Sequence, residues 1–334
     1  KGIYFELRSN IDLNHYPWIP IGNTKYHFQG IFNGNNHIIT NINISQTSDY
    51  SGLFNYLDHA KISNVTIICT LNSNGKYNGA LSGYMKNTAL LNIHIKGEIT
   101  GKKYTGGVMG SGEQISMTNV SFIGIIHGSN YTGGFSGSLI NSSVSKCFIK
   151  GNITGKFFTG GAVGTLNNSK IERVHVSCYI TGYDNVGGII GGNENNDLIY
   201  NVTYILVYGQ INGTKNIGGI IGRALSTNIH VKNSIVSAKI IGSFNSGALI
   251  GSSHDSLSNY ANLYYNKDKT IIPIGNIKNV QFLTNIKGLN SIEITQYNIS
   301  NANLLWEYEI NKQDHIIEPF DDNNKTDKHS IETR

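Results

Sequence analysis

The chain has 334 residues, only 14% of them charged, and its 26 Lys and Arg against 21 Asp and Glu give a net charge of +5 at pH 7. This small charge, without any basic run, excludes the electrostatic footprint of a nucleic-acid-binding protein. The sequence contains neither an apolar stretch of about eighteen residues nor the pattern of a signal peptide, so we expect no membrane span in this segment.

Residues 1–49 are expected to form an N-terminal cap and the first strands of the fold. Trp18 and Pro20 suit a cap, because an indole covers apolar surface and a proline withholds a backbone donor from an open strand edge. The sequence Asn33-Gly34-Asn35-Asn36 predicts a tight turn between strands. Capping of this kind is what a repeat protein needs at its ends.

Residues 50–251 repeat one glycine motif eight times, and the copy Tyr131-Thr132-Gly133-Gly134-Phe135-Ser136-Gly137 illustrates it. The first glycines of successive copies are separated by 27 residues five times, then by 31 and then by 29. A fixed period of this size is the signature of a solenoid. The first glycines of the eight copies are Gly52, Gly79, Gly106, Gly133, Gly160, Gly187, Gly218 and Gly247.

Short segments rich in Ile, Val, Thr and aromatic residues separate the motifs, and many alternate apolar with polar residues, as residues 174–178 do. A period of 27 residues that holds two or three short strands corresponds to one rung of a parallel β-helix, with rungs about 4.8 Å apart. We therefore predict an all-β fold, a parallel and right-handed β-helix solenoid of about eight 27-residue rungs with N- and C-terminal caps.

A second column, which we call the ladder column, lies two residues before each first glycine. If it faces inward, it forms a core ladder of stacked aromatics and hydrogen-bonded amides. If it faces outward, its aromatics offer a platform for sugars or for a partner protein. Its place beside the glycine step favours the inward ladder. The ladder column consists of Tyr50, Tyr77, Tyr104, Tyr131, Phe158, Asn185, Asn216 and Asn245.

A third column, five residues before each first glycine, holds Asn74 and then glycines such as Gly101 and Gly128. These residues enter left-handed backbone conformations at the least cost, so the column predicts a turn at the same place in every repeat.

Residues 252–310 are expected to form the final strands and a C-terminal cap. The stretches 262–265 and 271–275 predict strands, and the run 291–306 predicts a short helix or an irregular cap. Residues 311–334 are polar and aperiodic, which predicts a tail or a linker. Because the chain begins without methionine, we expect a processed protein or an excised piece.

The motif and its spacing resemble a known family of repeats. An aromatic residue followed by Gly-Gly, two apolar residues and a further glycine is similar to the GLUG-motif repeats of bacterial surface and secreted proteins. These proteins include adhesins and relatives of IgA-cleaving peptidases. The opening segments 4–7, 18–22 and 28–39 resemble the lead-in to such repeats. The resemblance covers residues 4–306 and implies a scaffold that serves several functions.

The histidines and cysteines predict no metal site and no cofactor. His94 and His175 share a column, but three rungs separate them. Side chains alternate between the two faces of a strand, and this alternation predicts that both histidines face the solvent between apolar neighbours. Cys69 and Cys178 share a column four rungs apart, and Cys147 lies in a neighbouring column. We therefore expect three unpaired cysteines that face the core.

A polysaccharide-degrading enzyme is one alternative, because glycosidases and lyases occur on β-helices. A glycosidase needs two carboxylates roughly 5 to 10 Å apart. Glu194, Asp197 and Asp255 are the catalytic candidates, since each follows the glycine end of a rung and the two-rung spacing puts Glu194 about 10 Å from Asp255. Arg223 falls on the rung between them, however, and alternating acid and base is typical of a surface charge ladder.

These patterns favour a non-enzymatic extracellular or cell-surface module, an adhesin-like stalk or binding segment of a larger secreted protein. The expected partner is a host or neighbouring-cell surface protein or glycan, or further copies of this chain. The alternatives are a structural subunit of an extracellular filament and the polysaccharide-degrading glycosidase or lyase. The sequence identifies no ligand-binding residue.

Overall fold

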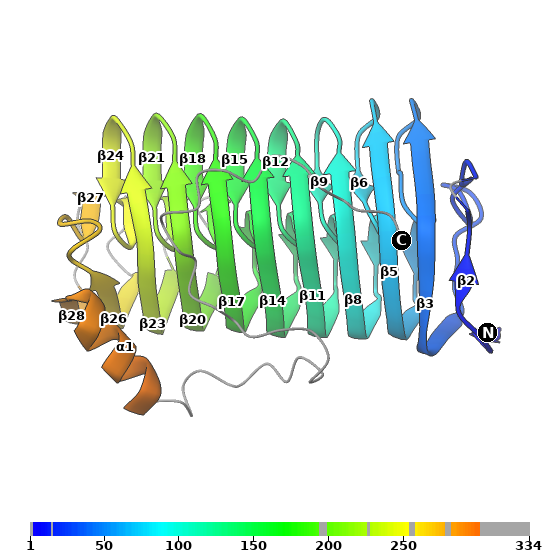
Figure 1. The fold of residues 1–334 in the computed structure, drawn as a ribbon. Helices are drawn as coiled ribbons and strands as arrows, with labels where there is room; N and C mark the ends of the chain where they lie inside the picture. The colour runs from blue at the N-terminus through cyan, green and yellow to red at the C-terminus, as the bar shows by residue number, and fades with distance from the viewer. Residues whose placement is uncertain are drawn as a thin grey trace.

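The computed structural model describes residues 3–14, 16–193, 199–225, 228–253, 258–277 and 282–300. These residues form a parallel β-solenoid of about ten turns with a spacing of roughly 27 residues, which confirms the predicted fold class (Figure 1). The solenoid has more turns than the sequence has motif copies, because strands stack before the first copy and after the last one.

The rungs build three sheets in which neighbouring strands run parallel, and the longest strands form a twelve-stranded sheet. Its strands are β1 (Tyr4–Glu6), β2 (Ile11–Asp12), β3 (Ile31–Gln46), β5 (Lys61–Ser73), β8 (Ala89–Thr100), β11 (Ser116–His127), β14 (Ser143–Thr154), β17 (Lys170–Thr181), β20 (Ile199–Asn212), β23 (Asn228–Ile241), β26 (Asn259–Asn266) and β28 (Phe282–Leu289).

Two sheets of short strands complete each rung. The seven-stranded sheet contains β6 (Asn78–Gly79), β9 (Thr105–Gly106), β12 (Asn130–Gly133), β15 (Phe157–Gly160), β18 (Asp184–Gly187), β21 (Lys215–Gly218) and β24 (Phe244–Gly247). The nine-stranded sheet contains β4 (Phe54–Asp58), β7 (Ser82–Lys86), β10 (Met109–Glu113), β13 (Ser136–Ile140), β16 (Val163–Asn167), β19 (Ile190–Gly192), β22 (Ile221–Ala224), β25 (Ile250–Ser253) and β27 (Ile274–Ile277).

The three glycines of the motif solve three different steric problems. A Cβ on Gly133 would lie 2.6 Å from the Cα atom of Val163 on the next rung, and one on Gly134 would lie 2.7 Å from the Cδ1 atom of Ile149 in the core. A Cβ on Gly137 would lie 2.6 Å from the Cα atom of Tyr104 in the ladder column. Real Cβ atoms do not approach other atoms this closely, so each position is confined to glycine.

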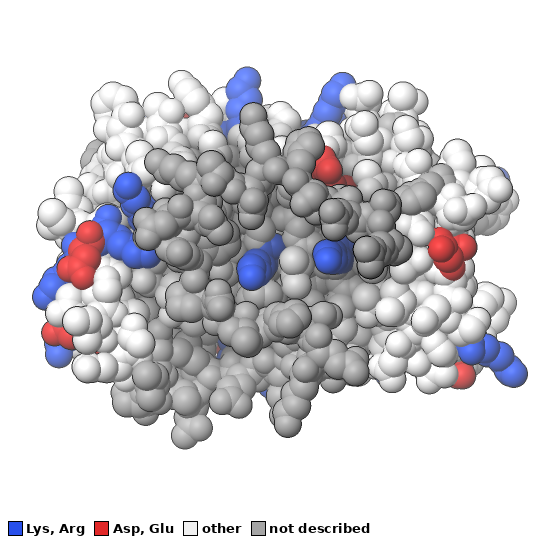
Figure 2. All heavy atoms as spheres, in the orientation of Figure 1, with Lys and Arg blue, Asp and Glu red and all other residues white. Residues whose placement is uncertain are grey.

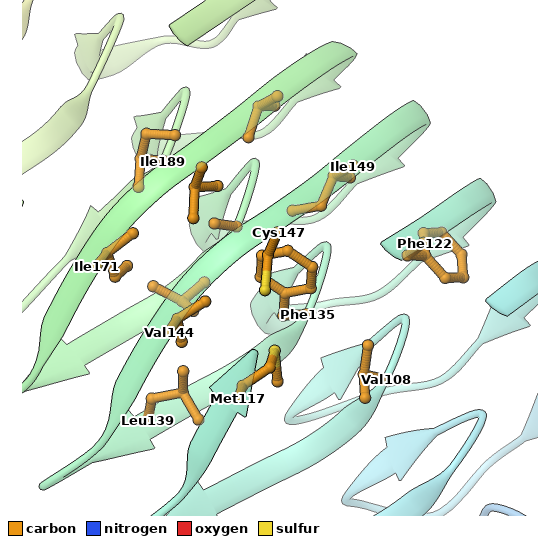
Figure 3. Close-up of a cluster of buried hydrophobic side chains, with 14 of the residues drawn as sticks. Val108, Met117, Phe122, Phe135, Leu139, Val144, Cys147, Ile149, Ile171 and Ile189 are labelled. Atoms are coloured by element: carbon orange, nitrogen blue, oxygen red, sulfur yellow. The ribbon is translucent and has the colours of Figure 1, made fainter. Parts of the chain in front are cut away.

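The core lies between the twelve-stranded sheet and the two sheets of short strands. Alternation along each strand sends every second side chain inward, and each fully buried aliphatic side chain stabilises the fold by about 1.5 to 3 kcal/mol. Figure 3 shows one section of this core, with Val108, Met117, Phe122, Phe135, Leu139, Val144, Cys147, Ile149, Ile171 and Ile189.

The three cysteines are buried and unpaired, as predicted. Cys147 pairs in register with Val174, and a run of glycines separates Cys69 from Cys178 in the column that both occupy. Burial raises the pKa of all three thiols to about 12. The thiols therefore stay protonated at neutral pH and act as small apolar core groups.

The turn predicted at the Gly101 column has a different backbone conformation from the expected one. Neither Gly101 nor Gly128 has a positive φ, whereas all eight residues of the ladder column do, with φ between 52° and 67°. A Cβ on Gly128 would lie 2.1 Å from the Oγ1 atom of Thr132, so this glycine is needed for space. The left-handed residue is the aromatic or asparagine three positions later.

The only helix of the described residues, α1 (Ser291–Ser300), packs against β26 and β28 at the C-terminal end of the solenoid (Figure 1). It begins with a capping box in which the backbone N of Glu293 donates to Asn290 Oδ1 at 2.8 Å and the backbone N of Asn290 donates to Glu293 Oε2 at 2.6 Å. In the part of the chain that the structure describes, no helix is long and apolar enough to cross a membrane. The predicted tail, residues 311–334, lies outside the described residues.

Candidate functional site

The five aromatic residues of the ladder column stack ring over ring along the axis of the solenoid. The centroid distances are 4.8 Å for Tyr50 and Tyr77, 4.8 Å for Tyr77 and Tyr104, 4.7 Å for Tyr104 and Tyr131, and 5.3 Å for Tyr131 and Phe158. The interplanar angles are 13° or less. These distances match the strand spacing, so the register of the sheets imposes the stack.

The rings lie outside the core, which corrects the inward arrangement that the glycine step favoured. They are half-buried, belong to no core cluster, and rest against the outer side of the nine-stranded sheet, where Tyr84 meets Tyr77 edge-on at 6.1 Å. The reason is the left-handed backbone, which turns these side chains away from the interior. Since neighbouring rings cover each other's faces, the stack also offers no free ring faces along its length for sugars.

The three asparagines of the ladder column continue the same line with amide hydrogen bonds. Asn216 Nδ2 donates to Asn185 Oδ1 at 2.9 Å, and Asn245 Nδ2 donates to Asn216 Oδ1 at 2.9 Å. Asn216 Nδ2 also donates to Asp184 Oδ1 at 2.9 Å. Asn185 and Asn216 are only 4% exposed, so these bonds satisfy amides that solvent does not reach.

A groove runs along the corner where the nine-stranded sheet turns into the twelve-stranded sheet. Three adjoining hollows of about 530, 510 and 440 Å³ form it, and each shares residues with the next: first Gln114 and Ser116, then Lys170 and Asn201. The groove therefore follows the solenoid axis from residues near Gln29 to residues near Lys232.

Small and amide side chains at the corner leave the groove hollow. Ser142 and Ser169 form its floor, where Ser142 Oγ accepts from the backbone N of Ile115 at 3.0 Å and Ser169 Oγ accepts from the backbone N of Ser142 at 2.9 Å. On the rim, Asn168 Nδ2 donates to Asn141 Oδ1 at 2.7 Å. Both asparagines have a positive φ, 44° for Asn168 and 51° for Asn141, which makes the sharp corner.

The groove is neutral in its middle, carries Lys61 at the end near Gln29, and holds most of its charged groups at the opposite end. There, Glu172 forms ion pairs with Lys170 and Arg173. The hydrogen bond from Lys170 lowers the pKa of the Glu172 carboxyl, so the group is ionised at neutral pH. Lys232 lines the same end of the groove, and Arg173 lies 5.3 Å from the ring centroid of Tyr204. The groove can therefore offer amide and hydroxyl hydrogen bonds in its middle and charged groups at its two ends.

The catalytic candidates from the sequence lie outside the described residues. Glu194, Asp197 and Asp255 fall in the segments 194–198 and 254–257. The register does place Arg223 opposite Gly192 and Ser252, on the rung between the strands that precede these segments. The strands before the two segments are thus two rungs apart, as the prediction assumed. The catalytic role of the three carboxylates stays a prediction.

One histidine lies within hydrogen-bond distance of a serine, with His94 Nδ1 2.9 Å from Ser121 Oγ. Both lie on the outer face of the twelve-stranded sheet as partners on adjacent strands, β8 and β11. Burial lowers the pKa of His94, which keeps its imidazole neutral, as a general base requires. Ser121 is only 4% exposed, however, so a substrate carbonyl has no access to its hydroxyl, and the pair serves packing.

The histidines on the outer face of the twelve-stranded sheet are less exposed than the alternation of side chains along their strands predicted. His175 faces outward, yet burial lowers its pKa to about 4, and its ring lies edge-on to those of Phe148 and Tyr208 at 5.2 and 5.6 Å. The expected solvent-facing position is thus wrong for His175, because apolar neighbours on adjacent strands surround the ring. Within the described ranges, no three His, Cys, Asp or Glu side chains gather where they could hold a metal ion.

Comparison with solved structures gives two proteins of similar fold. A structure described as an IgA1 protease superposes with a TM-score of 0.53 and 15% identity over 98% of this chain and 25% of that chain. A Bacteroides ovatus protein described as a proposed immunoglobulin A1 protease gives a TM-score of 0.39 and 20% identity over 91% of this chain and 82% of that chain. The first likeness shows a shared β-solenoid, and this chain spans a quarter of that protein's length.

Searches of protein families and of curated proteins give no match. The GLUG resemblance therefore stays a prediction, while its connection to IgA-cleaving peptidases agrees with the name of the first structure, an IgA1 protease. The name of the first structure belongs to a class of enzymes, which contradicts the expectation that the chain is not an enzyme.

Proposed function

We propose that this chain is the β-helical substrate-binding part of a larger, secreted enzyme of the protease class, and that the groove holds an extended stretch of substrate. The observation that carries the proposal is the continuity of three hollows along one corner of the solenoid. Its amide and hydroxyl lining suits the repeated polar groups of a polypeptide or a glycan, which lie along a chain as the groove's groups lie along the solenoid.

The comparison with solved structures supports the enzyme class in this proposal. The protein named IgA1 protease has the same architecture across nearly all of this chain, and three quarters of that protein lie beyond the matched part. A separate catalytic part would agree with the geometry here, where the contact between His94 and Ser121 is inaccessible. An extracellular or cell-surface location and a host or neighbouring-cell glycoprotein partner belong to the same proposal. The adhesin-like and filament roles stay predictions.

Filling the groove tests the proposal. Ser116 and Ser143 are exposed residues at the start of β11 and β14 that line the groove, so Ser116→Tyr with Ser143→Tyr would occupy its hollow without entering the core. Binding of IgA1 to the immobilised chain should weaken at least tenfold, measured by biolayer interferometry. The matched control is Thr154→Tyr at the exposed far end of β14, which should change binding less than twofold.

Two outcomes contradict the proposal. If the parent chain binds neither IgA1 nor a panel of extended peptides and glycans at micromolar concentrations, the groove is not a substrate-binding surface. If binding occurs but the groove variant retains it while Thr154→Tyr loses it, the binding surface is elsewhere on the solenoid. Circular dichroism of each variant must show the β-sheet signal of the parent chain.

A further inference from the structure

The twelve-stranded sheet has a column of amides that is separate from the ladder column. Six of its strands place an asparagine at the same register position, each with a left-handed φ of 53° or 54°. Amides on neighbouring rungs are hydrogen-bonded: Asn119 Nδ2 donates to Asn92 Oδ1 at 2.8 Å, and Asn285 Nδ2 donates to Asn262 Oδ1 at 2.9 Å. We call this set the sheet column, and its asparagines are Asn64, Asn92, Asn119, Asn233, Asn262 and Asn285.

Three consecutive strands interrupt the sheet column. At the same register position β14 has Lys146, β17 has Arg173 and β20 has Tyr204, with φ values of 53°, 53° and 56°. The backbone conformation is unchanged, but these residues tolerate it less well than asparagine does, and they cannot continue the line of amide hydrogen bonds. The stability of the sheet therefore does not explain their presence, and strain of this kind is typical of functional positions.

The interruption lies at the end of the groove near Lys232. The hollow of about 440 Å³ at this end is lined by Lys170 and Glu172 on β17, by Asn201, Thr203 and Tyr204 on β20, and by His230 and Lys232 on β23. In register, Asn201 lies between Lys170 and His230, and Thr203 lies between Glu172 and Lys232. Since β17 and β23 are two strands apart, about 10 Å, the two lysines flank a floor that β20 supplies.

Basic residues predominate around this hollow. Glu172 is the only acid in the strands β14, β17, β20 and β23, which together carry six Lys or Arg residues. Arg173 and Lys170 both form ion pairs with Glu172, whereas Lys232 has no ion pair with any described carboxylate. Figure 2 shows lysine and arginine side chains near the middle of the face that this sheet forms. The positive charge at this end of the groove therefore exceeds the negative charge of its own residues.

The lining of the hollow also has polar groups that its own contacts do not use. The Nδ1 atom of His230 is buried and has no hydrogen-bond partner among the described residues. Within the same residues, the side-chain amide of Asn201 and the hydroxyl of Thr203 make no hydrogen bond. An anion that enters the hollow can therefore meet free donors on β20 as well as the two ammonium groups.

We propose that this end of the groove binds one carboxylate of an extended polypeptide, held over β20 between the ammonium groups of Lys170 and Lys232. The inference rests on the proposed function, because it assigns a role to one end of the same groove. The carboxylate oxygens accept hydrogen bonds from the Asn201 amide and the Thr203 hydroxyl below them. Charge-assisted hydrogen bonds of this kind are stronger than those between neutral groups.

Glu172 in the lining favours a group with a single negative charge. Arg173 pairs with Glu172 and reduces the repulsion that this acid exerts on an incoming anion. A doubly charged phosphate would still be repelled more strongly than a carboxylate, since the repulsion grows with the charge of the ligand. An acidic side chain of a polypeptide therefore fits the site better than a phosphorylated one.

The neutral middle of the groove indicates where the acid stands in the bound polypeptide. Ser143 lines the middle hollow at the start of β14, and β14 is two strands from β20, about 10 Å. An extended polypeptide covers this distance with about three residues. The acidic residue is therefore expected about three positions away from the neutral residue that lies over Ser143.

Peptides selected from a random decapeptide phage library on the immobilised full chain test the site. We expect an Asp or Glu at a fixed position in the selected peptides, and its replacement by the matching amide should weaken binding at least tenfold in fluorescence polarisation. Lys232→Met removes one ammonium group and keeps an apolar stem, so it should reduce this preference to less than threefold. Lys239→Met is the matched control, because it removes the same charge from the exposed far end of β23 and should leave the preference unchanged.

Arg173→Asn separates a binding role from a structural one. The substitution restores an asparagine to the sheet column, so the melting temperature should stay at the parent value or rise. The preference for the acidic peptide should fall at least threefold, because Glu172 loses one of its two partners. A lower melting temperature with an unchanged preference would show that Arg173 only stabilises the sheet, and it would overturn the site.

The outcomes also separate this inference from the function on which it rests. If the selected peptides lose binding to the chain with Ser116→Tyr and Ser143→Tyr but show no preference for an acid, the carboxylate site is wrong and the groove stands. If the library yields no binding peptide, the groove is contradicted and the site with it. If polygalacturonate, an acidic polysaccharide, binds more tightly than every acidic peptide, the ligand is a glycan and the polypeptide is wrong.

Discussion

The ladder column has an aromatic half, from Tyr50 to Phe158, and an amide half, from Asn185 to Asn245. Both halves have the same backbone conformation, with φ between 54° and 67° in the first and between 52° and 59° in the second. Asparagine enters this left-handed region easily, whereas for other residues it costs about 1 to 2 kcal/mol each. The aromatic half tolerates this strain because each inner ring stacks on two others, at about 0.5 to 1.5 kcal/mol per pair.

The comparison teaches that the backbone, and not the side chain, defines the ladder column. The third glycine of the motif, present in seven of the eight copies, makes room for the ladder backbone in both halves. Stacked rings and hydrogen-bonded amides are then two ways to stabilise a left-handed residue at strand spacing. The first suits a half-exposed surface, while the second suits a buried one, where an amide without a partner would be costly.

The largest expected effect comes from the glycine beneath the ladder column. A Cβ on Gly137 would lie 2.4 Å from Tyr131 O, and one on Gly222 would lie 2.5 Å from Val186 N, so both meet backbone atoms that cannot move aside. Gly137→Ala and Gly222→Ala should each lower the free energy of unfolding by more than about 3 kcal/mol. Denaturant unfolding followed by circular dichroism measures this. If only one of the two variants loses stability, the side chains of the ladder column, and not its backbone, determine the packing.

The next effect distinguishes buried from exposed amides. Asn216→Leu removes one donor and one acceptor from the buried amide line and places a branched residue at φ 55°. We expect a loss of about 3 kcal/mol in the free energy of unfolding. Asn262→Leu is the control, since Asn262 has φ 53° and donates to Asn233 at 2.9 Å on the exposed surface, and it should cost about 1 kcal/mol. Equal losses would contradict the role of burial.

A smaller effect separates stacking from backbone strain. Tyr104→Leu removes two ring contacts and keeps a residue that disfavours φ 57°, so we expect a loss of about 2 to 3 kcal/mol. Tyr104→Asn also removes the ring contacts but relieves the strain, so its loss should be about 1 kcal/mol. The difference between the two melting temperatures measures the strain. If Tyr104→Asn is the less stable variant, stacking alone supports the aromatic half.

The smallest effect is the response to alkaline pH, which only the aromatic half should show. Burial raises the pKa of Tyr77 and of Tyr84 above the usual value of about 10. Their contribution to stability is therefore complete below pH 10 and is lost as the pH rises through the raised values, because the unfolded chain ionises first. The melting temperature should fall as the pH rises above about 10, and Tyr84→Phe should reduce this fall by a few degrees. An unchanged fall would contradict the assignment.

The sequence predicted the fold well and the candidate site poorly. The spacing of the glycines gives the rung length, and the constant offset between columns gives the register, as the pairing of Gly133 with Gly160 illustrates. The groove was not predicted, although Ser142, Ser169 and the asparagines Asn141 and Asn168 repeat at the same period. Small polar residues at a corner have no distinct signal in sequence, since their use depends on the bulk of the neighbouring side chains.

What the sequence by itself determined is the repeat, the parallel stacking and the set of residues that share a column. These follow from local backbone preferences and from the alternation of side chains along a strand, both of which are properties of the chain alone. Only the tertiary structure decided that the ladder column lies outside the core, that the corner is hollow and that Phe148 is buried on an outer face. Alternation tells which side of a strand a residue takes, but contacts between distant segments decide what covers that side.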